Sequence, residues 1–412
     1  MRKLLVFTEN HLVGGGTRYM FDLVNGAIDA FDAVIFVCNR KAISDSEKAG
    51  MNEKETIVRL FFFSRASCYF ALSFLPQKWR RLILFPVVLF EPLFLVCNIL
   101  IFLYIIRKYR ATHILSCNGG YPGSYAVLAM VLAARLMRKP SILSVVSYPV
   151  KRTGLRNVFM GFYEKILDKI LWCANPLVVA NANIIITALT TIRDMPTSCP
   201  SRVILNGICD ALPLSRVSCN DRFVLGCIAR MDKSKGVLFL LEAFIELSKK
   251  YPQLELVLAG YGDASARIEQ IVRDQQLEQK VKLLGHYSGD VNTLLSTFDV
   301  YVFPSLWEGF PYSLIEAMRS GCTIVSTSVG GIPEMITDDV EGVLIQPGSS
   351  IAIKDAIEDL LNNSEKRAVL SKGARQRFEQ KLTLGKMHAS VRELIFDIFD
   401  EKNQYNFSQK NT

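Results

Sequence analysis

Short apolar runs alternate with longer segments of mixed polarity along most of the chain. Apolar runs of about four to eight residues bounded by glycine, proline or polar residues are typical of buried strands, and the longer segments between them are typical of helices. The predicted strands are residues 4–7, 31–37, 113–116, 141–146, 184–187, 223–229, 254–259, 281–284, 300–303 and 323–327. Because strands that alternate with helices build parallel sheets covered on both faces, the pattern predicts an α/β protein.

One apolar segment, residues 82–106, does not fit this alternation. It holds a single charged residue, Glu91, and two prolines, Pro86 and Pro92. Basic residues flank it at Arg80, Arg81, Arg107, Lys108 and Arg110. The segment is long enough to cross a bilayer, but a crossing would divide strands that belong to one sheet. We therefore predict a helix or helical hairpin in the membrane interface, where the cations meet anionic lipid; the alternative is a pair of buried helices.

Length and charge narrow the class of protein. The 412 residues suit two domains of ordinary size. The formal net charge of +9 is uneven, because residues 1–220 hold 26 basic and 13 acidic side chains (+13) and residues 221–412 hold 22 and 26 (−4). A basic first half indicates an anionic partner. No cluster of Lys and Arg interleaved with aromatic residues is present, so nucleic acid is not the expected partner.

Cysteine usage and short motifs bear on the compartment and on metals. The ten cysteines form no C-x-x-C pair, which argues against structural zinc and a disulfide framework and favours a reducing cytosol. The apolar run at residues 4–7 is too short for a signal peptide. No Asp-x-Asp motif occurs. We therefore expect a cytoplasmic protein that uses no metal ion or other cofactor.

Residues 299–337 carry two carboxylates on a strand–loop–helix–strand unit. The helix is predicted at about 312–320, and Gly321 stands where a helix C-cap glycine belongs. Glu308 lies in the loop and Glu316 on the helix. Ligands bind at the carboxyl ends of parallel strands, helix N-termini attract anions, and carboxylates accept hydrogen bonds from sugar hydroxyls. The alternative for each glutamate is a solvated surface position.

Two further strand-to-helix connections predict anion sites. Arg230 and Lys235 follow the strand at 223–229 and precede a helix, a combination that suits a diphosphate. Gly14, Gly15 and Gly16 follow the first strand and would let backbone N–H groups approach a phosphate closely. A plain turn is the alternative for the glycines.

The residue order from Pro304 to Glu334 resembles that of the retaining nucleotide-sugar glycosyltransferases of family 4. The shared pattern is Pro-Ser-x-x-Glu-Gly-Phe-Pro-x-x-x-x-Glu-Ala, then Gly321, then Gly-Gly-x-Pro-Glu. The resemblance implies the GT-B fold, in which two doubly wound Rossmann-like domains face a central cleft. The expected parts are an acceptor-binding domain at 1–205, a linker at 206–220, a nucleotide-sugar-binding domain at 221–385, and a helix at 386–412 that returns to the first domain before a polar tail.

The same resemblance implies roles for individual residues. Glu308 would contact the donor sugar and Glu316 the ribose, while Arg230 and Lys235 would neutralise the leaving diphosphate. We thus predict catalysis by Arg230, Lys235 and Glu308. The residues expected to bind the donor are Gly15, Gly16, Gly309, Phe310, Pro311, Leu314 and Glu316.

This sequence departs from the family pattern at one place. Family members usually carry a histidine just after the strand at 141–146, where this chain reads Val-Val-Ser-Tyr-Pro. Ser147 is a local candidate to replace it, and an ordinary strand-end serine is the alternative. The lone histidines His11 and His113 are expected to be structural.

These features predict retaining transfer of a hexosyl unit from a nucleotide-diphosphate sugar to an acceptor hydroxyl. The expected acceptor is a lipid-linked glycan in cell-surface polysaccharide biosynthesis, at the inner face of the cell membrane. Two alternatives stay open: a GT-B hydrolase or epimerase of nucleotide sugars, and a catalytically degenerate scaffold bound to the membrane. Donor sugar, base, acceptor and linkage are not specified by the sequence.

Overall fold

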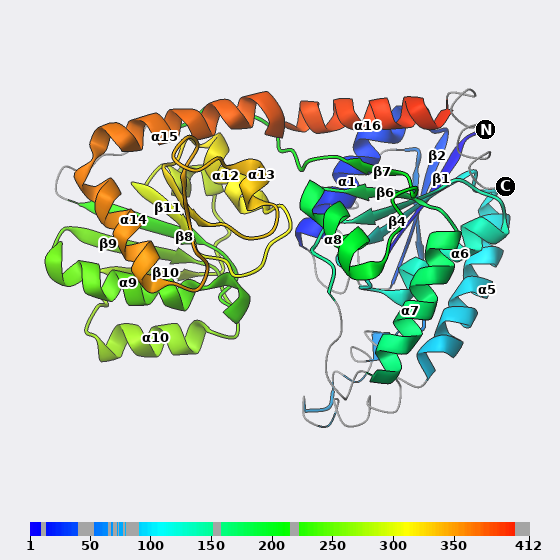
Figure 1. Ribbon diagram of the computed structural model, residues 1–412, viewed down its shortest axis with the longest axis horizontal. Helices are drawn as coiled ribbons and strands as arrows, with labels where there is room; N and C mark the ends of the chain where they lie inside the picture. The colour runs from blue at the N-terminus through cyan, green and yellow to red at the C-terminus, as the bar shows by residue number, and fades with distance from the viewer. Residues whose placement is uncertain are drawn as a thin grey trace. The chain divides into compact units, whose positions relative to one another are not determined.

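The computed structural model describes residues 1–9, 14–39, 53–64, 90–150, 158–214 and 222–399, with residues 67, 68, 72, 74–76 and 79. The chain divides into two compact units (Figure 1). The first unit comprises Met1–Ile204 and Met387–Thr412, and the second comprises Leu205–Lys386. Parts of the predicted linker and of the 82–106 segment lie outside the described residues, as do His11 and the whole polar tail at 401–412.

A parallel sheet forms the centre of the first unit. Its strands are β1 (Lys3–Thr8), β2 (Ala33–Cys38), β3 (Glu55–Arg59), β4 (His113–Asn118), β5 (Ser141–Val145), β6 (Leu177–Ala180) and β7 (Ser201–Val203). Their spatial order is β3-β2-β1-β4-β5-β6-β7, and every described pair is parallel. Strands β1 and β2 are rich in Val, Ile, Leu and Phe, and β1, β2 and β4 are almost wholly buried, as expected of a sheet covered on both faces.

Helices cover both faces of this sheet. They are α1 (Gly15–Ala27) followed by the short η1 (Ile28–Ala30), α5 (Glu91–Tyr109), α6 (Tyr125–Leu136), α7 (Val158–Cys173), α8 (Asn183–Arg193) and α16 (Leu384–Phe399). From Met387 onward, α16 belongs to the first unit and packs on α1. A Cβ on Gly26 would lie 3.0 Å from the Cβ of Val391, so glycine lets these two helices approach closely.

Two local predictions are wrong. Residues 184–187, predicted as a strand, lie in α8, where Ile185, Ala188 and Leu189 are buried at helical spacing. The strand of this region is β6, just before it, whose four residues are all buried. The first helix begins at Gly15, so Gly15 and Gly16 lie inside its first turn rather than ahead of it.

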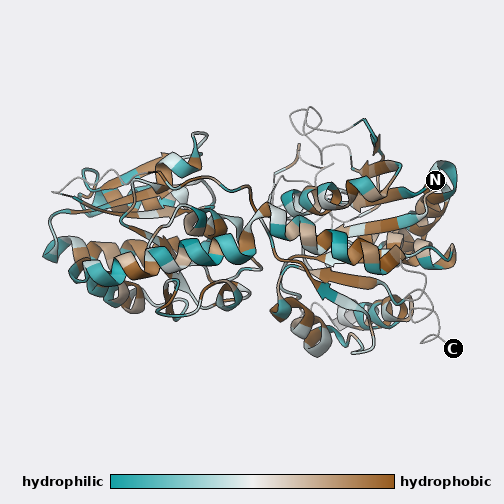
Figure 2. Ribbon diagram, turned by 90° about the horizontal axis from the view of Figure 1, so that it is seen from above, coloured by the Kyte–Doolittle hydropathy of each residue, from teal (hydrophilic) through white to brown (hydrophobic). Residues whose placement is uncertain are grey.

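A second parallel sheet forms the centre of the other unit. Its strands are β8 (Phe223–Ile228), β9 (Leu254–Ala259), β10 (Val281–Gly285), β11 (Val300–Phe303), β12 (Ile324–Thr327) and β13 (Val343–Ile345), in the order β10-β9-β8-β11-β12-β13. Its helices are η4 (Lys233–Lys235), α9 (Val237–Lys250), α10 (Ser265–Asp274), α11 (Val291–Leu295), α12 (Tyr312–Arg319), α13 (Ile332–Met335), α14 (Ser350–Asn362), α15 (Ser364–Arg377) and η5 (Phe378–Leu382). Figure 2 shows the apolar strands of both sheets among helices of mixed polarity. The predicted α/β class is confirmed.

The strand order fixes where a ligand can bind in each unit. In the first sheet the direction of winding reverses between β1 and β4, and in the second it reverses between β8 and β11. At such a switch point the loops leave neighbouring strands in opposite directions and open a crevice at the carboxyl edge. The loops after β8 and β11 hold Lys235 and Glu308, and Gly16 lies in the first turn of the helix that follows β1.

Candidate functional site

Three loops meet at the carboxyl edge of the second sheet. The loop after β11 is joined to the loop after β8 by the bond from Leu306 N–H to the Ser234 carbonyl, 2.7 Å long. It is joined to the loop after β12 by the bond from Gly331 N–H to the Gly309 carbonyl, 2.8 Å long. These backbone bonds make the three loops one connected surface, so side chains on different loops keep a fixed separation.

Lys235 and Glu308 form an ion pair across these loops. The Lys235 Nζ lies 2.6 Å from Glu308 Oε1, and the two side chains are 17% and 9% exposed. Glu308 is therefore almost removed from water, with a charged donor on one of its oxygens. The structure thus brings together two of the three predicted catalytic residues.

Glycines in the left-handed conformation make this pair possible. Gly236 has φ +63°, and a Cβ there would lie 2.0 Å from the carbonyl oxygen of Pro304. Gly330 has φ +54°, and a Cβ there would lie 1.9 Å from the carbonyl oxygen of Glu308. A larger residue at either position would force backbone atoms apart, so both glycines set the position of the Glu308 loop.

Arg230 takes a different position from Lys235. Its side chain is 71% exposed, and its Nη2 lies 3.1 Å from Asp232 Oδ2 on the same loop. Asp232 in turn accepts a hydrogen bond from the Ser234 N–H, 2.9 Å long, which caps η4. Arg230 is thus tethered near the end of β8 with its guanidinium in solvent, where it can meet a ligand.

The remaining predicted residues of this unit lie on or before α12. Glu316 is half-buried on α12, close enough to raise further the pKa of Tyr301, which burial already holds well above its usual value. Phe310 and Leu314 are buried side chains, so only their backbone atoms can reach a ligand. Gly309 and Pro311 lie in the loop and at the N-cap, and no side chain caps the N-terminus of α12. That terminus suits an anion.

The predicted glycines of the first unit lie at its own switch point. A Cβ on Gly16 would lie 3.5 Å from Val146 and 3.9 Å from the Cα of Gly119. Gly16 therefore borders the ends of β4 and β5, beside the place where the family histidine is missing. Glu9, which the sequence analysis did not single out, follows β1 here and accepts hydrogen bonds from the hydroxyls of Ser64 and Ser124.

His113, one of the lone histidines, is a structural residue. His113 begins β4, at the opposite end of that strand, where burial and the nearby Arg2 and Lys139 lower its pKa to about 4. It contacts the rings of Phe31 and Phe399 and is packed as part of the fold. Within the residues that the structure describes, no three His, Cys, Asp or Glu side chains gather to hold a metal ion.

Comparison with known proteins identifies the second unit. Residues 216–377 match the family model described as glycosyl transferases group 1. The second unit belongs to this family. The amylovoran biosynthesis glycosyltransferase AmsK of Erwinia amylovora is 34% identical over 133 residues, which cover 31% of this chain and 33% of AmsK. The chain spans only 33–42% of the length of the first curated relatives it matches.

Solved glycosyltransferase structures resemble the whole chain in fold. A glycosyltransferase from Rickettsia africae superposes with a TM-score of 0.73 at 18% identity, over 97% of this chain and 99% of that one. HepE from Anabaena, solved in complex with UDP, gives a TM-score of 0.68 at 18% identity, over 96% and 99%. The predicted GT-B fold is confirmed, and with it the resemblance to the group 1 glycosyl transferases.

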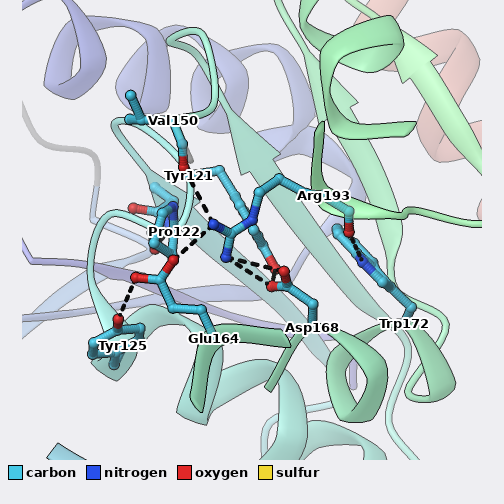
Figure 3. Close-up of polar contacts among 9 residues, drawn as sticks. Tyr121, Pro122, Tyr125, Val150, Glu164, Asp168, Trp172 and Arg193 are labelled. Carbon is cyan, nitrogen blue, oxygen red and sulfur yellow. Dashed lines mark hydrogen bonds and ion pairs between the residues drawn. The ribbon is translucent and has the colours of Figure 1, made fainter. Parts of the chain in front are cut away.

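Two sets of contacts in this chain were not predicted from its sequence. Asn206, buried beside the family motif, donates from its Nδ2 to the carbonyl of Phe310 over 2.6 Å, which holds the backbone before α12. The second set surrounds Arg193 at the end of α8 in the first unit (Figure 3). Neither set has a local sequence pattern, because the partners are far apart in the chain.

The Arg193 cluster is a buried charge network. The Arg193 guanidinium lies 2.7 Å from Glu164 and 3.0 Å from Asp168, both on α7. Tyr121 donates to Asp168 over 2.7 Å, and Tyr125 donates to Glu164 over 2.8 Å. Burial raises the pKa of Asp168, against the lowering effect of Tyr121 and Arg193.

This network holds the loop that follows β4 in position. Tyr121 stacks on Trp172, and its backbone carbonyl accepts from the N–H of Val150. The Val150 carbonyl accepts from Arg193 over 3.2 Å. Arg193 thus holds two connections at the carboxyl edge of the first sheet, the one after β4 and the one after β5. We assign it a positioning role.

We expect Arg193→Met to lower the free energy of unfolding of the first unit by about 3–5 kcal/mol, because two buried carboxylates lose their counter-charge. Arg202→Met is the matched control: Arg202 is exposed, lies 3.5 Å from Asp397, and should contribute less than about 1 kcal/mol. Urea unfolding of both variants provides the measurement. Equal stability of the two variants would show that the network contributes nothing to the fold.

Proposed function

We propose that this chain is a retaining glycosyltransferase that moves a hexosyl unit from a nucleotide-diphosphate sugar to an acceptor hydroxyl. The observation that carries the proposal is the Lys235–Glu308 pair at the switch point of the group 1 unit. A cation beside a nearly buried carboxylate offers one group to a diphosphate and another to sugar hydroxyls. HepE, of the same fold, was solved in complex with UDP, which supports a nucleotide donor.

The chemistry assigned to these residues is electrostatic. As the donor's glycosidic bond breaks, negative charge grows on the leaving diphosphate, and preorganised positive groups stabilise that transition state. Lys235, Arg230 and the N-terminus of α12 supply the positive groups. Lys235 exchanges its Glu308 partner for phosphate, and Glu308 then accepts hydrogen bonds from the donor sugar. Glu316 binds the ribose. No metal ion is needed for these steps.

The acceptor is proposed to bind to the first unit, near Gly15, Gly16 and Glu9. The name of AmsK, which belongs to amylovoran biosynthesis, supports a polysaccharide as the product. A lipid-linked glycan is the acceptor we favour, because the first half of the chain is basic and carries an exposed apolar helix. The deciding experiment measures nucleotide release across a panel of nucleotide sugars, with and without a membrane lipid extract. Release that needs the extract supports transfer, release without it indicates a hydrolase, and nucleotide binding without release indicates a scaffold.

Helix α5 supports association with a membrane surface. Among the described helices it is the one long and apolar enough to cross a membrane by length and composition, with a mean hydropathy of 1.6. One face packs inward through Asn98, Phe102, Ile105 and Ile106, while α5 lies against α6 (Figure 1). The other face exposes apolar side chains that are 52–63% accessible, namely Phe90, Leu93, Val96, Leu100 and Tyr104.

An exposed apolar face that ends in cations suits an interfacial position. Arg107, Lys108 and Arg110 close the helix, where each can contribute about 1 kcal/mol of attraction to anionic lipid. The buried face of α5 argues against a helix that crosses the bilayer, because its side chains would have to separate from the sheet that they cover. We propose that α5 rests in the inner face of the cell membrane with its exposed face in the acyl boundary.

Replacing Arg230 or Lys235 by Ala should lower turnover by about 10²-fold or more, the scale for one lost transition-state donor. Lys235→Ala also leaves Glu308 without its partner. The factor by which turnover falls in the double variant, Glu308→Gln with Lys235→Ala, should therefore be smaller than the product of the factors for the two single variants. Initial rates with the active donor test this. Arg267→Ala, an exposed arginine on α10, is the control and should keep the wild-type rate. Near wild-type turnover in both site variants would remove the diphosphate assignment.

The two glutamates should separate sugar recognition from nucleotide recognition. Glu308→Gln should impair use of the donor sugar while the free nucleoside diphosphate still binds. Glu316→Ala should weaken the nucleoside diphosphate by roughly 1–3 kcal/mol, the range for hydrogen bonds to a charged group. Calorimetric titration with the diphosphate and with the donor distinguishes the two. The reverse pattern would mean that the roles are exchanged.

Changing Leu93, Val96 and Leu100 together to Ser should release the protein from anionic vesicles and leave nucleotide binding intact, because all three side chains are exposed. Wild-type protein should sediment with the vesicles and be released only partly by high salt, since apolar insertion is not screened. Ser at Leu283, Ile351 and Val369, exposed in the second unit, is the matched control. Sedimentation of both triple variants with vesicles would overturn the α5 assignment.

A further inference from the structure

The first unit contains a large apolar cavity at the end of its sheet opposite the glycine loop. The cavity has a volume of about 940 Å³ and is lined by the first residues of β1, β4, β5 and β6, including Leu4, His113, Ser141 and Leu177. The residues proposed to bind the acceptor follow the carboxyl end of β1 instead. The cavity is therefore separate from the proposed glycosyltransferase site.

Apolar side chains from the sheet and from two helices line the cavity. Leu23 on α1 forms one wall, Ile142 and Leu177 on the sheet form the second, and Leu394 on α16 forms the third. In Figure 1, α16 runs alongside α1 over this part of the unit. The volume lies within the roughly 300–1,000 Å³ of small-molecule sites, and burial of apolar ligand surface against such walls is the main source of affinity there.

The mouth of the cavity carries positive charge. Arg135, Arg138 and Lys139 are among its lining residues, at the end of α6 and in the turn that leads to β5. None of the three forms an ion pair with a carboxylate of the described residues, and no Asp or Glu lines the cavity. The side chain of Leu136, 67% exposed, lies between these cations in sequence. Three cations without counter-charges beside an apolar interior are complementary to a ligand with an anionic head and a hydrocarbon tail.

We propose that this cavity binds an anionic single-chain amphiphile, with its tail against Leu23, Ile142 and Leu177 and its carboxylate or phosphate head at Arg135, Arg138 and Lys139. A fatty carboxylate and a lipid monophosphate share this chemistry. The cationic mouth discriminates against neutral and cationic amphiphiles of the same chain length. Because α16 forms one wall, an occupied cavity ties that helix to the sheet through the ligand.

The test uses full-length protein and cis-parinaric acid, a fatty acid whose fluorescence rises in an apolar site. Dodecanoate, dodecyl phosphate and dodecyltrimethylammonium then compete below their micellar concentrations. We expect both anions to displace the probe at concentrations at least 10-fold lower than the cation does. The more effective anion identifies the preferred head group. Displacement by the cation at the same concentration would overturn the proposal.

Charge and volume variants locate the binding. Arg135→Glu with Arg138→Glu should weaken parinarate binding at least 10-fold, whereas Arg267→Glu with Arg273→Glu, the same charge change on exposed residues of α10, should leave it unchanged. Ile142→Trp should fill the cavity and abolish binding while the circular dichroism spectrum is retained. Equal binding by the two double variants, which change only exposed side chains, would refute the assignment even if Ile142→Trp failed to fold.

Three further measurements test whether the probe binds elsewhere or whether another segment or a second copy fills the cavity. The Leu93, Val96 and Leu100 variant should bind the probe as tightly as wild type; loss of binding there would place the probe on α5. A chain ending at residue 399 should also bind equally, whereas tighter binding would show that residues 400–412 fill the cavity. Light scattering should give the same mass for wild type and the Arg135/Arg138 double variant. A wild-type dimer that this variant dissociates would assign the cavity to a second copy.

Discussion

The candidate donor site depends on backbone contacts that only glycine permits. Gly236 lets the turn before α9 touch the carbonyl of Pro304, and Gly330 lets the loop after β12 touch the carbonyl of Glu308. Both have positive φ, so a side chain would add strain as well as a clash. Because the three loops are fixed by these contacts and by two backbone hydrogen bonds, Lys235 and Glu308 meet at 2.6 Å across 73 residues of sequence. These two glycines, which carry no functional group of their own, thereby control the geometry of the charged groups.

The Lys235–Glu308 pair also offsets the cost of burying Glu308. A carboxylate that is 9% exposed is costly to bury alone, and the lysine ammonium offsets that cost. In the proposed reaction, the diphosphate of the donor would compete with Glu308 for the Lys235 ammonium. The hydroxyls of the donor sugar would then replace that ammonium at the Glu308 carboxylate. The exchange leaves each group with a partner, so binding need not expose a buried charge. Arg230, which is already in solvent, loses little by turning to the phosphate.

The sequence predicted best what is encoded locally. Strand, loop and helix between residues 300 and 327 follow from apolar runs and from glycine and proline positions, and Gly321 has the positive φ of a C-cap glycine. The segment at 184–187 was assigned to the wrong class because three consecutive isoleucines suit both a buried strand and a helix face. Burial of Ile185 and Leu189 on one side of α8 decided for the helix. Asn206, Glu9 and the Arg193 cluster have meaning only through distant partners, and a single sequence gives no sign of such pairs.

The first unit shows how one composition can serve two purposes. An apolar segment such as 82–106 was compatible with burial or with membrane contact, and α5 buries one face and exposes apolar side chains on another. Its inward face packs beside α6, so the helix is part of the folded unit. Its outward face has no cover within the described residues, which a soluble protein would normally avoid for so many adjacent apolar side chains. The three basic residues at its end and the three separate cations around the cavity beneath α16 are six of the 26 basic residues of this half of the chain. Charge placed beside apolar surface, rather than charge alone, is what points to amphiphilic partners and away from nucleic acid.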